Sequence, residues 1–148
     1  MDTGTPVSAA SGASTDLKNF RIAAGAVSGL VAVIAGAFAA HALKDRLEPA
    51  MLAAFETGAR YQMYHSLALL AVTALGDRLP DGEATAAAWL FAAGIVLFSG
   101  SLYALALTGH RSLGMVTPFG GLAFMAGWAC LAVGAMRGDC KADGKTGQ

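Results

Sequence analysis

Four long stretches of this chain contain no Asp, Glu, Lys or Arg, and they lie at residues 22–43, 61–76, 84–109 and 113–136. Crossing the roughly 30 Å hydrocarbon core of a bilayer takes about 20 helical residues at about 1.5 Å each. The first, third and fourth stretches reach that length alone. The second is shorter, but the chain from Pro49 onward is typical of one helix that becomes apolar near Thr57. The sequence therefore predicts four membrane helices, at about 22–43, 57–76, 84–108 and 117–136.

The scarcity of charge across the whole chain supports this prediction. Only 14% of the 148 residues are charged, whereas soluble domains carry about 25%. A soluble four-helix bundle needs a polar outer face on each helix, but residues 22–40 and 84–108 are apolar all round. We therefore predict an all-α fold, a four-helix integral membrane bundle whose second helix has an amphipathic extension before its membrane span. The zero net charge argues against nucleic acid as a partner.

The two ends of the chain differ in composition from the middle. Residues 1–17 and 137–148 are polar and poor in large apolar side chains, so we expect a disordered N-terminal tail and a polar C-terminal tail. Residues 18–136 form the single membrane domain. A cleaved signal peptide is the alternative for the first helix, but its apolar run exceeds the usual 7–15 residues, which favours a retained helix.

The short loops indicate how the protein is oriented. With four spans, both termini lie on one side, together with Lys18, Arg21, Arg78, Arg137, Lys141 and Lys145; the other side carries Lys44, Arg46, Arg60 and Arg111. Cytoplasmic loops are enriched in Lys and Arg. The bias predicts cytoplasmic termini in a plasma membrane, with the bacterial inner membrane preferred.

Small residues recur at helical spacing in the first and last spans. Such residues let membrane helices approach closely, because lipid gives no hydrophobic drive for their association. The candidates for helix packing are Gly25, Gly29 and Gly36 in the first span and Gly120, Gly127 and Gly134 in the last. The sequence leaves two interpretations open: these glycines pack helices within one chain, or they form an interface with another copy or another membrane protein.

Polar side chains inside the spans gather toward the side opposite the termini. Burying them in hydrocarbon is expensive, so they are the best functional clue. The candidates are His41, Glu56, Arg60, Tyr61, Tyr64, His65, Ser99, Ser101, Tyr103 and Thr117. In the second helix most of them project from one half of the helix, and Gln62 lies just off that half. One interpretation is hydrogen bonding between helices. The other is a polar pocket for a ligand, proton or ion, in which His41 and His65 titrate and Glu56 and Arg60 set the local field.

Other chemistry is thinly supported by the sequence. Cys130 lies in a span and Cys140 in the tail, and the chain has no CxxC, HExxH or G-x-S-x-G motif. We therefore expect no metal, no cofactor, no catalytic residues and no enzyme activity.

Four segments in order resemble one family. They are GAFAAHAL (36–43), FETGARYQMYHSLALL (55–70), FSGSLYALALTG (98–109) and TPFGGLAFMAGW (117–128). These segments resemble the domain-of-unknown-function 423 family of small membrane proteins, and the likeness extends over about residues 22–136. The resemblance implies a small multi-pass protein without an assigned biochemical activity.

The sequence is consistent with two functions. The favoured one is a structural or accessory membrane component, with the lipid bilayer and other membrane proteins or a second copy as partners. The alternative is a small transporter, channel or ligand-binding protein that uses the His, Tyr, Glu and Arg side chains.

Overall fold

The computed structural model describes residues 7–143 of the chain, and these residues form helices and no strand. The long helices are α1 (Val7–Phe38), α2 (Pro49–Leu75), α3 (Asp81–Gly94), α4 (Gly100–Thr108) and α5 (Thr117–Asp143). A π-helical turn, Ala39–Leu43, extends α1, and a second one, Ile95–Ser99, joins α3 to α4 in one continuous rod. Short 3-10 turns, Gly76–Arg78 and Arg111–Met115, lie between the rods.

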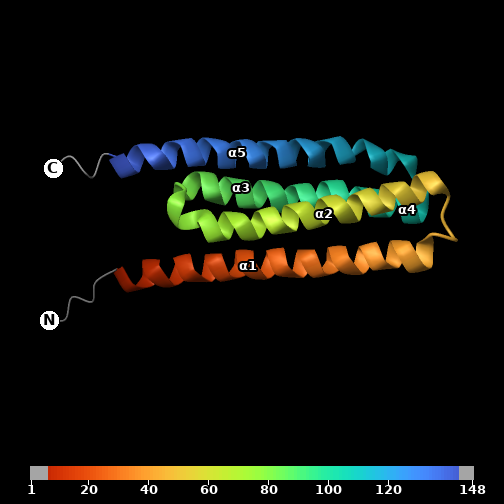
Figure 1. The fold of residues 1–148 in the computed structure, drawn as a ribbon, viewed down its shortest axis with the longest axis horizontal. Coiled ribbons are helices and arrows are strands. Elements are labelled where there is room, and N and C mark those ends of the chain that lie inside the picture. Colours follow the sequence, from red (N-terminus) through yellow and green to blue (C-terminus); the bar gives the residue numbers. More distant parts are fainter. Residues whose placement is uncertain (1–6, 144–148) are drawn as a thin grey trace.

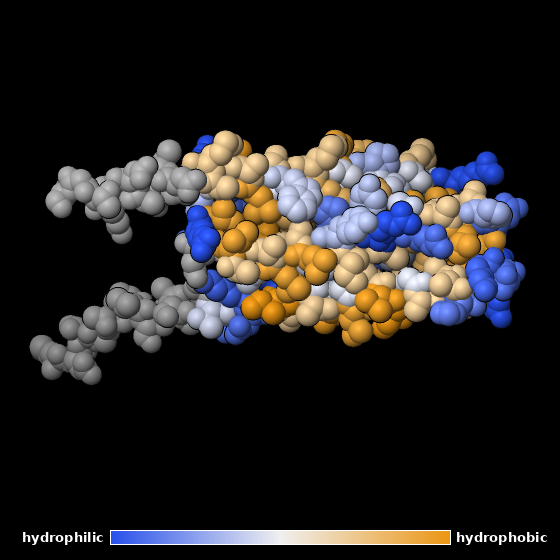
Figure 2. All heavy atoms as spheres, viewed as in Figure 1, coloured by the Kyte–Doolittle hydropathy of each residue, from blue (hydrophilic) through white to orange (hydrophobic). Residues whose placement is uncertain are grey.

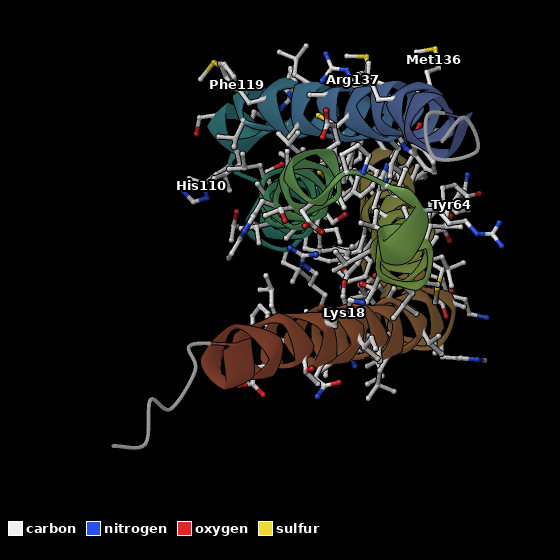
Figure 3. All side chains as sticks on the ribbon, turned by 90° about the vertical axis from the view of Figure 1, so that its left-hand side faces the viewer. Lys18, Tyr64, His110, Phe119, Met136 and Arg137 are labelled. Atoms are coloured by element: carbon white, nitrogen blue, oxygen red, sulfur yellow. The ribbon has the colours of Figure 1, made fainter. Side chains whose placement is uncertain are left out.

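The helices form four antiparallel rods in three layers (Figure 1). The middle layer consists of α2 and the rod of α3 and α4; α1 packs on one side of it and α5 on the other (Figures 1 and 3). The start of α1, the α2–α3 turn and the end of α5 lie together at what we call the terminal end. The loops at residues 44–48 and 109–116 lie at the opposite, loop end. The predicted all-α four-helix fold is confirmed.

Proline and glycine set several of the helix boundaries. Pro49 is the first residue of α2 and Pro118 the second of α5, where the missing N–H of proline costs nothing. Gly109, with φ of 73°, follows the last residue of α4. That left-handed conformation is easy for glycine and strained for other residues.

Both terminal helices are longer than their predicted spans. Helix α1 begins at Val7 and α5 ends at Asp143, so residues 7–17 and 137–143 are helical where tails were expected. Adding residues to an existing helix costs far less than starting one, and these segments contain no proline after Pro6. The remaining residues of the two predicted tails, 1–6 and 144–148, lie outside the described part.

Three of the rods are long and apolar enough to cross a membrane: Thr15–Leu43, Asp81–Thr108 and Arg111–Arg137. Helix α2 has 27 residues, about 40 Å at about 1.5 Å per residue, but it is more polar. Its Gln62, His65 and Ser66 are buried inside the bundle. The low hydropathy of α2 therefore comes in part from side chains that face other helices and in part from the exposed Glu56 and Arg60.

The core is built mainly from small side chains around a few large ones. Toward the terminal end, Phe91 and Val72 are fully buried among alanines of α2 and α3, and Phe124 of α5 closes the cluster. Toward the loop end, Phe55 packs with Leu43 and Ala106. Large apolar side chains cover much of the outside, and Figure 2 shows hydrophilic ends and a flank that is largely apolar apart from hydrophilic atoms over α2. This pattern suits a bundle surrounded by lipid.

Candidate functional site

The structure distributes the ten candidate polar residues over several places instead of one cavity. Four of them lie between helices: Ser99, Ser101, Tyr103 and Thr117. Three lie where α2 meets α5: Tyr61, Tyr64 and His65. Glu56 and Arg60 are exposed on the flank where α2 meets α1, and His41 is exposed near the loop end.

Gln62 joins three rods through its side chain. The Tyr103 hydroxyl donates to Gln62 Oε1 at 2.8 Å, and Gln62 Nε2 donates to the Ser28 carbonyl at 3.0 Å. Ser66 Oγ lies 2.7 Å from Ser28 Oγ and 2.7 Å from the Gln62 carbonyl. The network therefore connects α1, α2 and α4 through bonds that need no water.

Gln62 is the interhelical link that the helical projection missed. The projection placed it just off the polar half of the second helix, whereas in the structure it is buried and faces Ser28 and Tyr103. The available signal was its chemistry, because an amide in an apolar span must find partners on neighbouring helices.

Ser101 and Ser99 lie in the same rod but differ in whether the hydroxyl bonds to another helix. Ser101 Oγ lies 2.8 Å from Thr117 Oγ1, a contact that joins α4 to the start of α5. Ser99 is buried in the π-helical turn, and its Oγ has no hydrogen-bond partner among the described residues. Only the first serine therefore links two helices.

Two hydrogen bonds assign the tautomer of His65. Nδ1 lies 2.8 Å from the Tyr61 carbonyl, which only accepts, so Nδ1 carries the proton. Nε2 lies 3.3 Å from Nε1 of Trp128, which only donates, so Nε2 is the acceptor. The ring also stacks on Phe124 with 3.4 Å between centroids and 5° between planes. Both nitrogens of this buried imidazole are thus used inside the protein.

An open groove of about 840 Å³ lies beside His65, between α2 and α5. Its lining is mostly aromatic and apolar: Tyr61, Tyr64, His65, Phe98, Pro118, Gly121, Leu122, Phe124, Met125 and Trp128. Tyr61 stacks on Phe98 with 4.7 Å between ring centroids, so part of the wall is held in place by ring contacts. Figure 3 shows Tyr64 on the outer side of α2. The groove opens to the outside of the bundle and not into its interior.

A smaller hollow of about 350 Å³ lies on the other side of Tyr64, where α1 meets α2. Glu56 and Arg60 line it together with Ala32, Gly36 and Ala59. Figure 2 shows hydrophilic atoms over α2 between apolar surfaces. These two charged side chains are separated from the Gln62 network, which faces the interior.

Most of the candidate packing glycines face other helices of the same chain. A Cβ on Gly25 would meet the Leu70 side chain at 2.9 Å, and one on Gly127 would meet the Phe91 ring at 2.7 Å. Gly120 lies against Phe98 and Gly134 against Glu83, while Gly29 has a looser contact with Ser66 at 3.8 Å. Gly36 has no such neighbour within 4 Å. Five of the six therefore face the chain's own helices, and Gly36 lines the smaller hollow.

The described residues contain no group of three or more His, Cys, Asp or Glu side chains placed to hold a metal ion. His41 is exposed, far along the chain from His65, and no contact between the two is seen in the described part. The arrangement offers hydrogen-bonded helix contacts, an apolar groove and a charged hollow.

Comparison with known proteins gives the family. The family described as "Protein of unknown function (DUF423)" matches residues 35–121, a range that contains all ten candidate polar residues. The UPF0382 membrane protein YwdK of Bacillus subtilis is 46% identical over 114 residues, which cover 76% of this chain and 93% of the relative.

Two further relatives extend the match to Gram-negative bacteria. A UPF0382 membrane protein of Haemophilus influenzae is 43% identical and covers 82% of this chain and 97% of its own length. The UPF0382 inner membrane protein YgdD of Escherichia coli is 41% identical and covers 80% and 90% respectively. No solved structure matches the chain significantly.

Proposed function

Because the chain belongs to the DUF423 family of membrane proteins, which has no assigned activity, we propose that it is a non-catalytic accessory component of the membrane. It acts by binding a transmembrane helix of another membrane protein in the groove between α2 and α5. The observation that carries this proposal is the contrast between a closed polar interior and an open apolar groove.

The closed interior favours binding over transport. The buried side chains that could line a polar path are bonded to each other, as in the chain from Tyr103 through Gln62 to Ser28. Of the buried side-chain polar atoms that the structure describes, Ser99 Oγ alone lacks a partner. His65 has no free nitrogen for a proton relay. A transporter would need such groups to face a water-filled cavity.

The groove has the properties of a helix-binding surface in lipid. Aromatic and Met side chains form its walls, and such residues are enriched at protein interfaces. Gly121 lies in its lining, and a Cβ there would meet only the Phe98 ring, at 3.9 Å. A small residue between large ones allows a second backbone to approach closely.

The location that we propose is the bacterial inner membrane with cytoplasmic termini. The inner-membrane relative in Escherichia coli and the excess of Lys and Arg on the terminal side support it. The antiparallel arrangement of four rods, with the start of α1 and the end of α5 at one end, fits termini on a single face (Figure 1).

Site-specific photo-crosslinking in living cells tests the proposal. A benzophenone amino acid replaces Leu122, an exposed residue that lines the groove, or Val96, an exposed residue on the α3–α4 rod outside it. We expect a discrete protein adduct from Leu122 and none from Val96. Mass spectrometry should identify a membrane protein, cross-linked through one of its transmembrane segments.

The matched control fills the groove. Gly121→Phe places a ring where only Phe98 is near, so it should remove the Leu122 adduct while the protein still inserts and elutes as the wild type does. Equal adducts from both positions, an adduct that survives Gly121→Phe, or lipid adducts alone would refute the proposal. Solute flux in proteoliposomes that is lost in Gln62→Met would support the transporter instead.

A further inference from the structure

The hollow between α1 and α2 combines a small-residue floor with two opposite charges. Its volume is about 350 Å³, and Ala32, Gly36 and Ala59 line it. Glu56 and Arg60, one helical turn apart on α2, are exposed and also line it. The hollow is separate from the groove that carries the proposed function, although Tyr64 contributes to both.

Gly36 keeps this hollow open. A Cβ on Gly36 would meet no described atom within 4 Å beyond its own stretch of helix, whereas a Cβ on Gly25 of the same helix would meet Leu70 at 2.9 Å. The missing side chain of Gly36 therefore does not serve a close helix contact in this chain. What it provides is space beside two charged groups.

The two charges have no side-chain partner in the part of the chain that the structure describes. A Glu and an Arg four residues apart on a helix commonly attract each other, yet no ion pair or hydrogen bond of either side chain is found among the described residues. The same two helices also expose apolar side chains, among them Leu67 of α2 and Val33 of α1. A charge next to an apolar surface in the membrane is costly, and a polar partner lowers that cost.

The position along the helix places both charges near a membrane interface. The predicted membrane span of this helix begins near Thr57, so Glu56 lies at the start of the span and Arg60 about 5 Å into it, at about 1.5 Å per residue. The headgroup layer accounts for the difference between a hydrocarbon core of about 30 Å and a full bilayer of about 40–45 Å. The long Arg side chain can extend back toward that layer. Glu56 is thus the shallower charge and Arg60 the deeper one.

We propose that this hollow binds the headgroup of a zwitterionic phospholipid. In such a lipid the phosphate is attached to the glycerol and lies deeper, and the ammonium lies farther out. The deeper Arg60 matches the phosphate, which a guanidinium binds with two parallel hydrogen bonds. The shallower Glu56 matches the ammonium. The order of the two charges along α2 therefore fits the order of the two charges in the lipid.

A second copy of the chain is the competing occupant. In a parallel symmetric dimer, Arg60 of each copy would pair with Glu56 of the other. Exchanging the two residues, Glu56→Arg with Arg60→Glu, preserves those pairs but reverses the order of charge that a lipid would meet. The exchanged variant therefore separates the two occupants.

The experiment measures lipid binding to the full-length protein in detergent by native mass spectrometry. The probes are phosphatidylethanolamine, which carries phosphate and ammonium, and phosphatidylglycerol, which carries the phosphate without the ammonium. We expect the wild type to bind phosphatidylethanolamine about fivefold more tightly, because one favourable charge contact near the membrane surface has about that effect.

The variants assign the effect to the hollow. Glu56→Gln should remove the preference between the two lipids, Arg60→Gln should weaken both, and Gly36→Leu should weaken both by filling the space. Lys44→Gln, which removes an exposed charge at the same end of the bundle, is the matched control and should bind as the wild type does. Elution volume and helical content check that each variant is folded.

Several results would overturn the proposal. One is equal binding of the two lipids by the wild type, and another is an exchanged variant that keeps the wild-type preference. A dimer that dissociates in Arg60→Gln but persists in the exchanged variant would assign the hollow to a second copy.

Discussion

At the scale of single residues, the interior of this protein depends on polar groups that satisfy one another. Water is absent from the bilayer core, so a buried amide or hydroxyl without a partner is costly. Gln62 accepts a hydrogen bond from Tyr103 and donates one to the Ser28 carbonyl. His65 donates to the Tyr61 carbonyl and accepts from Trp128. These residues act as links between rods.

The Gln62 link can be tested by a double-mutant cycle with Tyr103. Gln62→Met should lower the free energy of unfolding by roughly 1–2 kcal/mol, because it removes two interhelical bonds at about 0.6 kcal/mol each and leaves the Tyr103 hydroxyl without its acceptor. The measurement is unfolding in dodecyl sulfate, followed by tryptophan fluorescence.

Tyr103→Phe on its own supplies the comparison. Because the two side chains are hydrogen-bonded, the double variant should be more stable than the sum of the two single effects predicts, by about 0.6 kcal/mol. Strictly additive effects would mean that the two side chains do not interact.

The sequence predicted which residues are polar inside the spans, but not their partners. A helical projection describes one helix at a time, so it could group Tyr61 and His65 and could not find Ser28 or Trp128 across the bundle. Gln62 was placed off the polar half for the same reason. Glu56 and Arg60 were grouped with the interior residues, although the structure has them on the flank.

At the scale of helices, glycine determines how closely the rods approach. Gly127 of α5 faces the fully buried ring of Phe91 on α3, and Gly25 of α1 faces Leu70 on α2. At the terminal end, polar contacts add to this packing: Arg137 pairs with Glu83 at 2.6 Å, and Arg21 donates to Thr85 at 2.8 Å. The outer rods α1 and α5 are both attached to the middle layer in this way.

Gly127→Ala tests the contact between α5 and α3. Its Cβ would lie 2.7 Å from the Phe91 ring, and overpacking of this kind costs about 1–3 kcal/mol. Gly121→Ala on the same helix is the control, since its Cβ would lie 3.9 Å from Phe98. Replacing Gly by Ala stabilises a helix by about 1 kcal/mol at either position. The difference in thermal unfolding between the two variants in detergent therefore measures the cost of the contact with Phe91.

We expect Gly127→Ala to melt at a lower temperature than Gly121→Ala, and Gly121→Ala to be at least as stable as the wild type. Equal melting temperatures for the two variants would contradict the packing described for α5.

The helix ends at the loops were more predictable than the helix interiors or the outer ends of α1 and α5. Pro49, Gly109 and Pro118 mark boundaries through their own backbone chemistry, which is local and visible in the sequence. The π-helical turn at Ile95–Ser99 was not expected within the predicted span at 84–108. It lies where the backbone of Phe98 approaches Gly120 of α5, a tertiary contact that a single-helix pattern does not contain.

At the scale of the whole molecule, the fold separates three surfaces. The apolar outside suits lipid, the ends carry most of the charge, and the polar interior joins the rods. Hydropathy identifies three rods as long and apolar enough to cross a membrane, and α2 differs because it carries both buried polar side chains and the exposed Glu56 and Arg60. A four-span bundle therefore requires that α2 crosses the bilayer as the fourth span.

Single-cysteine accessibility measures this crossing directly. In a variant without Cys130 and Cys140, one cysteine is placed at Asp45, at Gly82 or at His110, and intact spheroplasts are treated with a membrane-impermeant maleimide. Four crossings with cytoplasmic termini predict labelling at positions 45 and 110 and protection at position 82 until the membrane is opened. Labelling of positions 45 and 82 from the same face would mean that α2 does not cross, and it would contradict the four-span bundle.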